Sequence, residues 1–158
     1  MPELAYEIGE LLRSKGLTLG TVESATGGLI AHLITNIAGS SDYFKGSVVS
    51  YANETKMDII GVKKTTLVKY GAVSSQVAEE MAQSGRELLN VDICVADTGI
   101  AGPGGATQGK AVGLFYLGLA HNGGVFSRKY EFHGSREENK KLAAQTALEW
   151  VRDYLQKS

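Results

Sequence analysis

Two short polar segments carry the residue types of a serine nucleophile and its base. The first, Glu23-Ser24-Ala25-Thr26-Gly27-Gly28, lies between a short predicted strand and a predicted helix. A serine at such a turn is held rigidly, and the free N–H groups and dipole of the following helix can bind an anion or a developing oxyanion. Gly27 and Gly28 let a ligand approach the backbone. Two other roles stay open: Ser24 or Thr26 only caps the helix, or the turn binds phosphate without catalysis.

The second segment, Ser50-Tyr51-Ala52-Asn53-Glu54-Thr55-Lys56, offers a candidate base. If Asn53 is the helix N-cap, Lys56 takes the third helical position, where the positive end of the helix lowers the pKa of an ammonium and burial lowers it further. A neutral lysine can accept a proton from a serine, and the hydroxyl of Tyr51 could join a proton relay. The alternative is a solvated surface lysine beside a half-buried tyrosine.

A glycine-rich loop follows a predicted buried strand. It reads Thr98-Gly99-Ile100-Ala101-Gly102-Pro103-Gly104-Gly105. Successive backbone N–H groups in such a loop can form an anion-binding nest, and Pro103 fixes one φ angle. The glycine spacing matches neither a Walker A loop nor a dinucleotide fingerprint. The alternative is a long connection with no ligand.

Arg136 lies in the first turn of the predicted C-terminal helix. The helix dipole disfavours a cation at that position, so a bound phosphate or carboxylate would explain the arginine. The alternative is an exposed arginine paired with a neighbouring glutamate, which contributes about 0–1 kcal/mol.

Hydrophobic periodicity predicts the elements that position these segments. Helices are expected over 4–15 and 29–37, from Asn53 to Gly61, over one turn at 65–70, and after the cap residue Ser74. A capping box of Ser135 and Glu138 opens the last helix. Strands are expected over 18–22, from Gly46 or Val48 to Tyr51, and over 91–96, 111–120 and 125–132.

The order of these elements predicts the fold class. Helices and strands alternate in the first part of the chain, and Asn122-Gly123 then indicates an antiparallel hairpin. This order favours an α/β fold: a single three-layer α/β/α domain over 1–158, with a mixed sheet covered by helices on both faces.

Composition narrows the possible partners. Sixteen basic against 17 acidic residues give a net charge of -1, which argues against a nucleic-acid binder. No apolar run approaches the ~20 residues of a membrane span, and the acidic start argues against a targeting leader, so a cytoplasmic protein is expected. The three histidines lack metal-ligand spacing, and the one cysteine, Cys94, is expected in the core.

Five segments occur in an order that resembles a known family. They are Glu23-Ser24-x-Thr26-Gly27-Gly28, Tyr51-x-Asn53-x-x-Lys56, Gly71-Ala72-Val73-Ser74, Thr98-Gly99-Ile100-Ala101-Gly102-Pro103 and Gly134-Ser135-Arg136. Together they resemble the C-terminal domain of the competence/damage-inducible protein CinA, which also exists as a stand-alone nicotinamide-nucleotide amidase. The resemblance covers roughly residues 4–155.

The resemblance implies an amidohydrolase of pyridine nucleotide salvage, which converts nicotinamide mononucleotide and water to nicotinate mononucleotide and ammonia. It implies Ser24 as the nucleophile, Lys56 as the base and Tyr51 as a residue near this serine–lysine dyad. It implies no cofactor and no metal. Many members have cysteine where this chain has Ala25, so a thiol at that position cannot be essential here.

The expected mechanism uses the turn and the glycine-rich loop for binding. Neutral Lys56 takes the Ser24 proton, and N–H groups near Thr26, Gly27 and Gly28 stabilise the oxyanion. The loop from Thr98 to Gly105 and Arg136 hold the ribose phosphate. The expected substrate-binding residues are therefore Thr26, Gly27, Gly28, Asn53, Thr98, Gly99, Gly102 and Arg136.

A non-catalytic nucleotide- or phosphate-binding module of the same family is the alternative function. It would use the same glycine loops without turning over a substrate. In either case the expected partner is a small pyridine nucleotide, with no nucleic acid and no membrane, and a homo-oligomer is expected.

Overall fold

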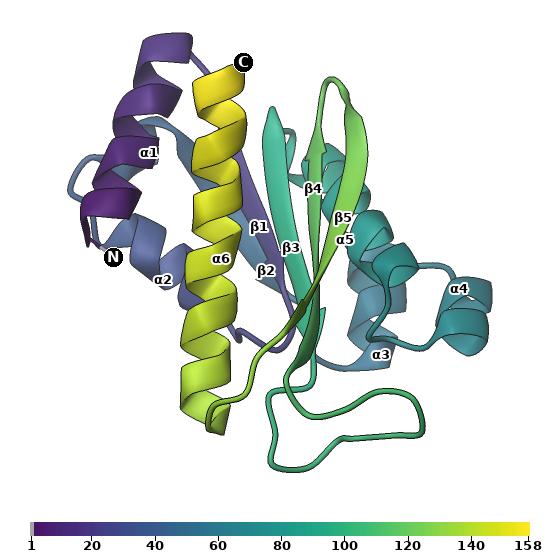
Figure 1. The fold of residues 1–158 in the computed structure, drawn as a ribbon. Coiled ribbons are helices and arrows are strands. Elements are labelled where there is room, and N and C mark those ends of the chain that lie inside the picture. The colour runs from purple at the N-terminus through teal and green to yellow at the C-terminus, as the bar shows by residue number, and fades with distance from the viewer. Residues whose placement is uncertain (1) are drawn as a thin grey trace.

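One mixed five-stranded sheet forms the centre of the computed structural model, which describes residues 2–158 (Figure 1). The strand order is β2-β1-β3-β4-β5. Strand β1 is parallel to β2 and to β3, whereas β4 is antiparallel to β3 and β5 is antiparallel to β4. The strands are β1 (Leu19–Glu23), β2 (Phe44–Val49), β3 (Ile93–Gly99), β4 (Leu114–His121) and β5 (Gly124–Glu131).

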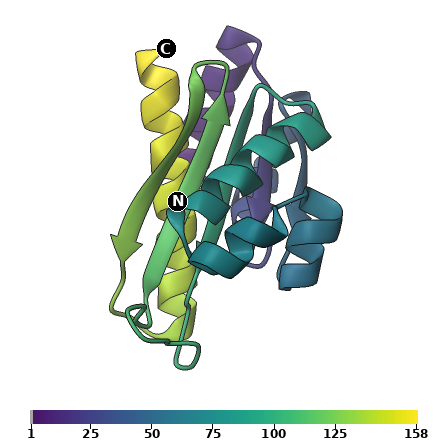
Figure 2. The same cartoon turned by 90° about the vertical axis from the view of Figure 1, so that its right-hand side faces the viewer.

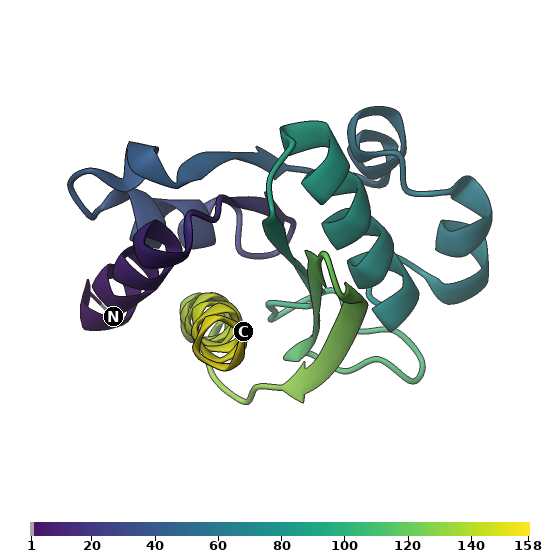
Figure 3. The same ribbon diagram turned by 90° about the horizontal axis from the view of Figure 1, so that it is seen from above.

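Helices cover both faces of this sheet, as Figures 2 and 3 show. One face carries α1 (Pro2–Lys15), α2 (Leu29–Thr35) and α6 (Arg136–Lys157). The other carries α5 (Ser75–Leu89), flanked by α3 (Asn53–Thr55), the π-helical turn η2 (Lys56–Ile60) and α4 (Lys64–Tyr70). A short 3-10 turn, η1 (Ser40–Asp42), precedes β2. The predicted three-layer α/β arrangement is confirmed.

The hydrophobic core lies in two layers, one on each side of the sheet. Leu12, Ile30 and Val151 belong to the layer under α1, α2 and α6. Met81 and Cys94 belong to the layer under α5, and burial raises the pKa of the Cys94 thiol to about 12. Because β3 is the central strand, its side chains are buried along almost its whole length.

Most local signals predicted the right elements, with shifted boundaries. Ser74 caps α5 by accepting a hydrogen bond from the Val77 N–H, and the capping box of Ser135 and Glu138 opens α6. The hairpin turns at Asn122-Gly123, as predicted. The strand predicted to end at Tyr51 is wrong in its bounds, since β2 ends at Val49 and leaves Tyr51 in a loop. Strand β3 also runs to Gly99, so the long connection to β4 begins later than predicted.

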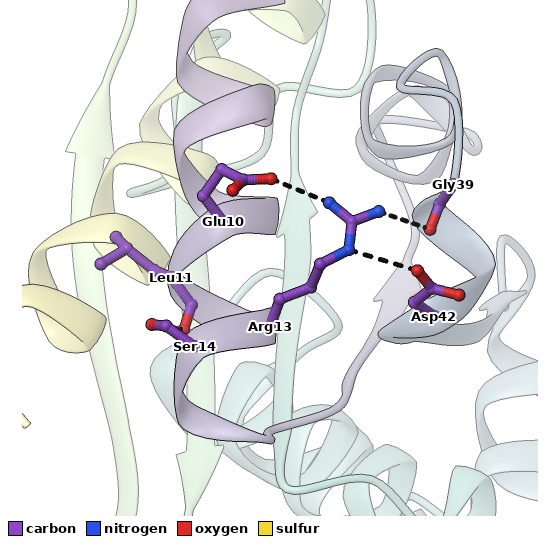
Figure 4. Close-up of polar contacts among 6 residues, drawn as sticks. All are labelled: Glu10, Leu11, Arg13, Ser14, Gly39 and Asp42. Atoms are coloured by element: carbon purple, nitrogen blue, oxygen red, sulfur yellow. Dashed lines mark hydrogen bonds and ion pairs between the residues drawn. The ribbon is translucent and has the colours of Figure 1, made fainter.

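A guanidinium joins the segment before β2 to the first helix (Figure 4). Arg13 on α1 donates to the Asp42 carboxylate at 3.2 Å, to the Gly39 carbonyl at 3.0 Å and to Glu10 at 2.9 Å. These contacts fix the segment just before the start of β2, which is an edge strand. The other end of β2 leads to Lys56.

The contact between α5 and β4 leaves no space for a side chain at Gly118. A Cβ there would lie 2.2 Å from the Ala78 carbonyl oxygen on α5. Because backbone must move to accept a methyl group, we expect Gly118→Ala to lower the free energy of unfolding by about 1–3 kcal/mol in chemical denaturation. Gly104→Ala is the matched control, since its Cβ meets nothing within 4 Å. Equal stability of the two variants would contradict this packing.

Candidate active site

A pocket of about 280 Å³ lies where the carboxyl ends of β1, β2 and β3 meet. This is the edge at which open α/β sheets commonly bind ligands. Ser24 follows β1, Tyr51 and Lys56 follow β2, and Thr98 and Gly99 end β3. The remaining lining residues are Ala25, Asn53, Ala72, Val73, Ile100, Ala101, Gly104, Gly105 and Arg136. The long β3–β4 connection extends past this end of the sheet (Figure 1).

The side chains of Ser24 and Lys56 are in direct contact in this pocket. Lys56 Nζ lies 2.8 Å from Ser24 Oγ, and the two residues are 1% and 7% exposed. Lys56 Nζ also donates to two backbone carbonyl oxygens, that of Ser50 at 2.7 Å and that of Tyr51 at 2.9 Å. The alternative of a solvated surface lysine is therefore wrong.

The three hydrogen-bond partners of Lys56 Nζ determine the direction of the lone pair on a neutral amine. A carbonyl oxygen can only accept a hydrogen bond, so each of the two carbonyls takes one N–H of the amine. A neutral amine has two protons, and its lone pair is then left facing Ser24 Oγ. Burial lowers the pKa of Lys56 below its ordinary value, while the negative charge of Asp97 opposes that shift. The arrangement can remove a proton from the serine hydroxyl.

The helix start before Lys56 differs from the prediction. Ala52, not Asn53, is the N-cap, and Asn53 is the first residue of α3. The Lys56 N–H bonds to the Ala52 carbonyl at 3.0 Å, and Lys56 then opens the π-helical turn η2, which ends at Gly61. Lys56 is thus one position further from the helix start than predicted, and burial is the first cause of its lowered pKa. Asn53 lines the pocket.

The N–H groups predicted to stabilise an oxyanion are already used within the protein, so that prediction is wrong. The Thr26 N–H donates to the Asp97 carboxylate at 3.1 Å, and the Gly27 N–H donates to the Ser24 carbonyl at 3.0 Å. The Gly28 N–H donates to Glu23 Oε1 at 3.1 Å. Thr26, Gly27 and Gly28 instead border a separate pocket of about 380 Å³ beside α6.

Glu23 caps the start of α2 from inside the protein. Its fully buried carboxylate accepts the N–H groups of Gly28, Ile30 and Ala31 at 2.9–3.1 Å. Neither Ser24 nor Thr26 is the cap, because the N-cap residue is Gly28. The positive end of α2 is therefore neutralised by Glu23 and does not act on a ligand beside Ser24.

The Ala25 N–H is the donor nearest in sequence to Ser24 that remains available. It has no hydrogen-bond partner among residues 2–158, and Ala25 lines the pocket together with Ser24. A backbone N–H directly after a nucleophilic serine is a common oxyanion donor.

Arg136 and Tyr51 close one side of the pocket together. Arg136 donates to the Tyr51 hydroxyl at 3.0 Å and to the Gly102 carbonyl at 2.8 Å. Tyr51 contacts Lys56 through its backbone carbonyl and Arg136 through its hydroxyl, so the proton relay through this hydroxyl stays a prediction. No carboxylate among the described residues forms an ion pair with Arg136, which excludes the predicted alternative of an Arg–Glu surface pair.

The end of β3 and the β3–β4 loop shape the pocket together. The backbone N–H groups of Gly102, Gly104 and Gly105 have no hydrogen-bond partner among residues 2–158, so the anion-binding nest stays a prediction. Thr98 Oγ1 donates to the Ala72 carbonyl at 2.8 Å, which joins the two walls of the pocket. Gly99 has a packing role, since a Cβ there would lie 2.3 Å from the Phe115 ring. Gly102 has a φ of +90°, a conformation that favours glycine, and its carbonyl holds Arg136.

Asp97 was not predicted as a site residue from the sequence, and Glu23 had no predicted role. Both carboxylates are completely buried under the turn that carries Ser24. Asp97 directly follows the apolar run 93–96, and a charged residue at the end of a buried strand was the signal that could have identified it. The carbonyl contacts of Lys56 had no such signal, because they depend on the backbone path after β2.

A family model described as the CinA C-terminal domain matches residues 1–155. The chain belongs to the CinA C-terminal domain family. A CinA-like protein of Syntrophomonas wolfei is 47% identical over 94% of this chain, and one of Geobacter sulfurreducens is 47% identical over 92%. The chain spans only 36% and 35% of the length of these two curated relatives.

Solved structures of the CinA family have the same fold. The competence/damage inducible protein CihA from Agrobacterium tumefaciens is 39% identical, with a TM-score of 0.94, and the match covers 98% of this chain and 94% of that chain. A CinA superfamily protein from Klebsiella pneumoniae is 27% identical, with a TM-score of 0.96, covering 99% and 98%.

Two further observations describe the part of the chain that the structure covers. Over residues 2–158, no group of three His, Cys, Asp or Glu side chains is arranged to hold a metal ion. Within the same range, no helix combines the length and the apolar character needed to cross a membrane.

The Ser24–Lys56 contact predicts a reactive serine. We expect a fluorophosphonate probe to label Ser24, at a rate that rises with pH as Lys56 loses its proton. Lys56→Met removes the base and should lower the labelling rate by about 10²-fold or more at neutral pH. Lys45→Met, at an exposed lysine, is the matched control and should label like the parent protein. Unchanged labelling of Lys56→Met, read by mass spectrometry of the Ser24 peptide, would contradict the assignment.

Proposed function

We propose that this protein is an amidohydrolase that converts nicotinamide mononucleotide and water to nicotinate mononucleotide and ammonia. The observation that carries the proposal is the 2.8 Å contact between Lys56 Nζ and Ser24 Oγ at the wall of a pocket. A lysine buried without a carboxylate directly on its ammonium group is unfavourable unless the site uses it, because burial disfavours the charged form. Membership of the CinA C-terminal domain family supports the same activity.

In the acylation half, Lys56 Nζ accepts the hydroxyl proton of Ser24 while Ser24 Oγ attacks the carboxamide carbon. The tetrahedral oxyanion accepts a hydrogen bond from the Ala25 N–H. Lys56 then returns its proton to the amide nitrogen, the carbon–nitrogen bond breaks, and ammonia leaves. The product of this half is an ester between Ser24 Oγ and the carboxyl group of nicotinate mononucleotide.

In the deacylation half, water takes the place of ammonia. Lys56 accepts a proton from the water as its oxygen attacks the ester carbon, and the same Ala25 N–H stabilises the second oxyanion. Collapse of this intermediate breaks the bond to Ser24 Oγ, which takes back the proton from Lys56. The amine thus begins and ends each cycle neutral.

Arg136 lines the pocket and takes no part in the proton transfers of Lys56, so it is available to bind an anionic group of the substrate. Two of its N–H groups hold Tyr51 and Gly102, and a guanidinium has five donors in all. The remaining donors suit the ribose phosphate of the nucleotide. The apolar wall formed by Ala72, Val73 and Ile100 suits the flat pyridine ring.

The function is tested by incubating the protein with nicotinamide mononucleotide and measuring ammonia. We expect release by the parent protein, a rate that increases with pH as Lys56 is deprotonated, and a loss of about 10³-fold or more in Ser24→Ala and Lys56→Met. Free nicotinamide lacks the phosphate that Arg136 would hold, so it should be a much poorer substrate.

The alternative, a binding module without turnover, makes a different prediction in the same assay. It gives saturable binding of the nucleotide with no ammonia, and Ser24→Ala would bind as the parent does. Ammonia release at an equal rate by parent and Ser24→Ala would reject the nucleophile, provided that both variants show the same circular dichroism spectrum.

A further inference from the structure

Two buried carboxylates lie under the nucleophile turn and are joined by one hydroxyl. Glu23 on β1 and Asp97 on β3 are both completely buried. Thr26 Oγ1 lies 2.8 Å from Glu23 Oε1 and is also within hydrogen-bonding distance of Asp97 Oδ1. Asp97 in addition accepts the N–H groups of Ser24 and Thr26, each at 3.1 Å. Asp97 therefore fixes the backbone on both sides of Ala25.

The two contacts of Thr26 Oγ1, one with Glu23 and one with Asp97, each need a proton between the oxygens. Two ionised carboxylates and one hydroxyl supply only one. A threonine hydroxyl has one proton, so it can donate to only one of the two carboxylate oxygens. If both groups were ionised, the other contact would join two acceptors with no proton between them. One additional proton resolves the conflict, because a protonated carboxyl can donate to Thr26 Oγ1 while the Thr26 hydroxyl donates to the other carboxylate.

The donors around each carboxylate decide where this proton resides. Glu23 accepts three backbone N–H groups at the start of α2, and hydroxyl groups of Thr21 and Ser47 lie beside its second oxygen. Donors therefore point at both carboxylate oxygens of Glu23, and a proton on either oxygen would compete with them. Asp97 accepts only two backbone N–H groups, so the proton belongs on Asp97.

We propose that Asp97 is the positioning residue of the Ser24 site, that its carboxyl holds a proton against Thr26, and that loss of this proton raises the basicity of Lys56. Among the described residues, the titratable groups that interact electrostatically with Asp97 are Glu23 on the neighbouring strand β1 and Lys56 on η2. Burial, followed by the nearby charge of Glu23, raises the pKa of Asp97 to about 6. The ionised carboxylate in turn raises the pKa of Lys56.

The charge of Asp97 determines the pH at which Lys56 loses its proton. A negative charge at Asp97 favours the ammonium form of Lys56, so ionised Asp97 moves deprotonation of Lys56 to higher pH. A neutral residue at position 97 removes that charge and moves deprotonation to lower pH. The effect on Lys56 rests on the proposed dyad, whereas the protonation of Asp97 does not.

The proton is read directly by carbon-13 NMR of the aspartate carboxyl groups in the parent protein. We expect one resonance, assigned to Asp97 by its loss in Asp97→Asn, to titrate near pH 6, well above the ordinary range of aspartate. A midpoint at or below about 4 would overturn the proposal, because it is the behaviour of a carboxylate ionised by its N–H donors. This measurement is made on the parent protein without substrate, and the Asp97→Asn variant is needed only to assign the resonance.

The effect on Lys56 is read from the pH dependence of fluorophosphonate labelling at Ser24. The labelling rate rises with pH as Lys56 loses its proton, and we expect Asp97→Asn to move this rising limb to lower pH by about one unit. We also expect the maximal labelling rate to fall by about tenfold to 10²-fold, because one N–H group of the Ser24 turn loses its acceptor. Asp58→Asn, at an exposed carboxylate on the same turn as Lys56, should leave the limb in place. A merely structural role would lower the rate without moving the limb, and that result would overturn the proposal.

Failure of this proposal is distinguishable from failure of the proposed function. If nicotinamide mononucleotide yields no ammonia but Asp97 titrates near pH 6 and the labelling limb moves, Asp97 acts as proposed on a serine site with another substrate. If ammonia is released but Asp97 titrates in the ordinary range, the amidase assignment holds and the role of Asp97 is rejected.

Discussion

The hydrogen bond between Lys56 Nζ and Ser24 Oγ is the interaction on which the rest of the site depends. It joins a turn after β1 to a turn after β2, residues that are 32 positions apart in the chain. The parallel pairing of the two strands brings their carboxyl ends together, and the carbonyls of Ser50 and Tyr51 then fix the direction of the amine. Without those two acceptors, the lone pair of a neutral lysine would have no preferred direction.

Keeping the serine in place requires two buried carboxyl groups, and the protein supplies hydrogen-bond donors for both. Glu23 is stabilised by the N–H groups at the start of α2, which elsewhere often bind a ligand anion. Asp97 is stabilised by the N–H groups of the Ser24 turn itself. The same hydrogen bonds that satisfy these carboxylates remove the helix end from the binding surface, so substrate charge must be met by other groups, such as Arg136.

The sequence predicted the architecture well because its local signals agree with the fold. The Asn122-Gly123 turn, the capping box at Ser135 and the serine cap at Ser74 each determine their element by short-range chemistry. The pairing of Ser24 with Lys56 came from residue types and from resemblance to the family, and the structure brings these two side chains together.

Other parts of the site could not be predicted, because they depend on long-range geometry. A serine- and threonine-rich turn before a helix indicates capping by its own side chains, and nothing local indicates that Glu23 would cap α2 instead. The role of Asp97 requires knowing that β3 lies beside β1. The contact of Lys56 with two carbonyls depends on the path of the chain after Val49, where the predicted strand was too long.

The most direct measurement of the central claim is the protonation of Lys56 itself. Carbon-13 labelling of the lysine side chains allows each ammonium group to be titrated by NMR, with Lys56→Met identifying the resonance. The account predicts that Lys56 loses its proton at a lower pH than the exposed lysines, because its amine is buried. Titration of Lys56 together with the exposed lysines would contradict the account, since no neutral amine would then be available to Ser24 near neutral pH.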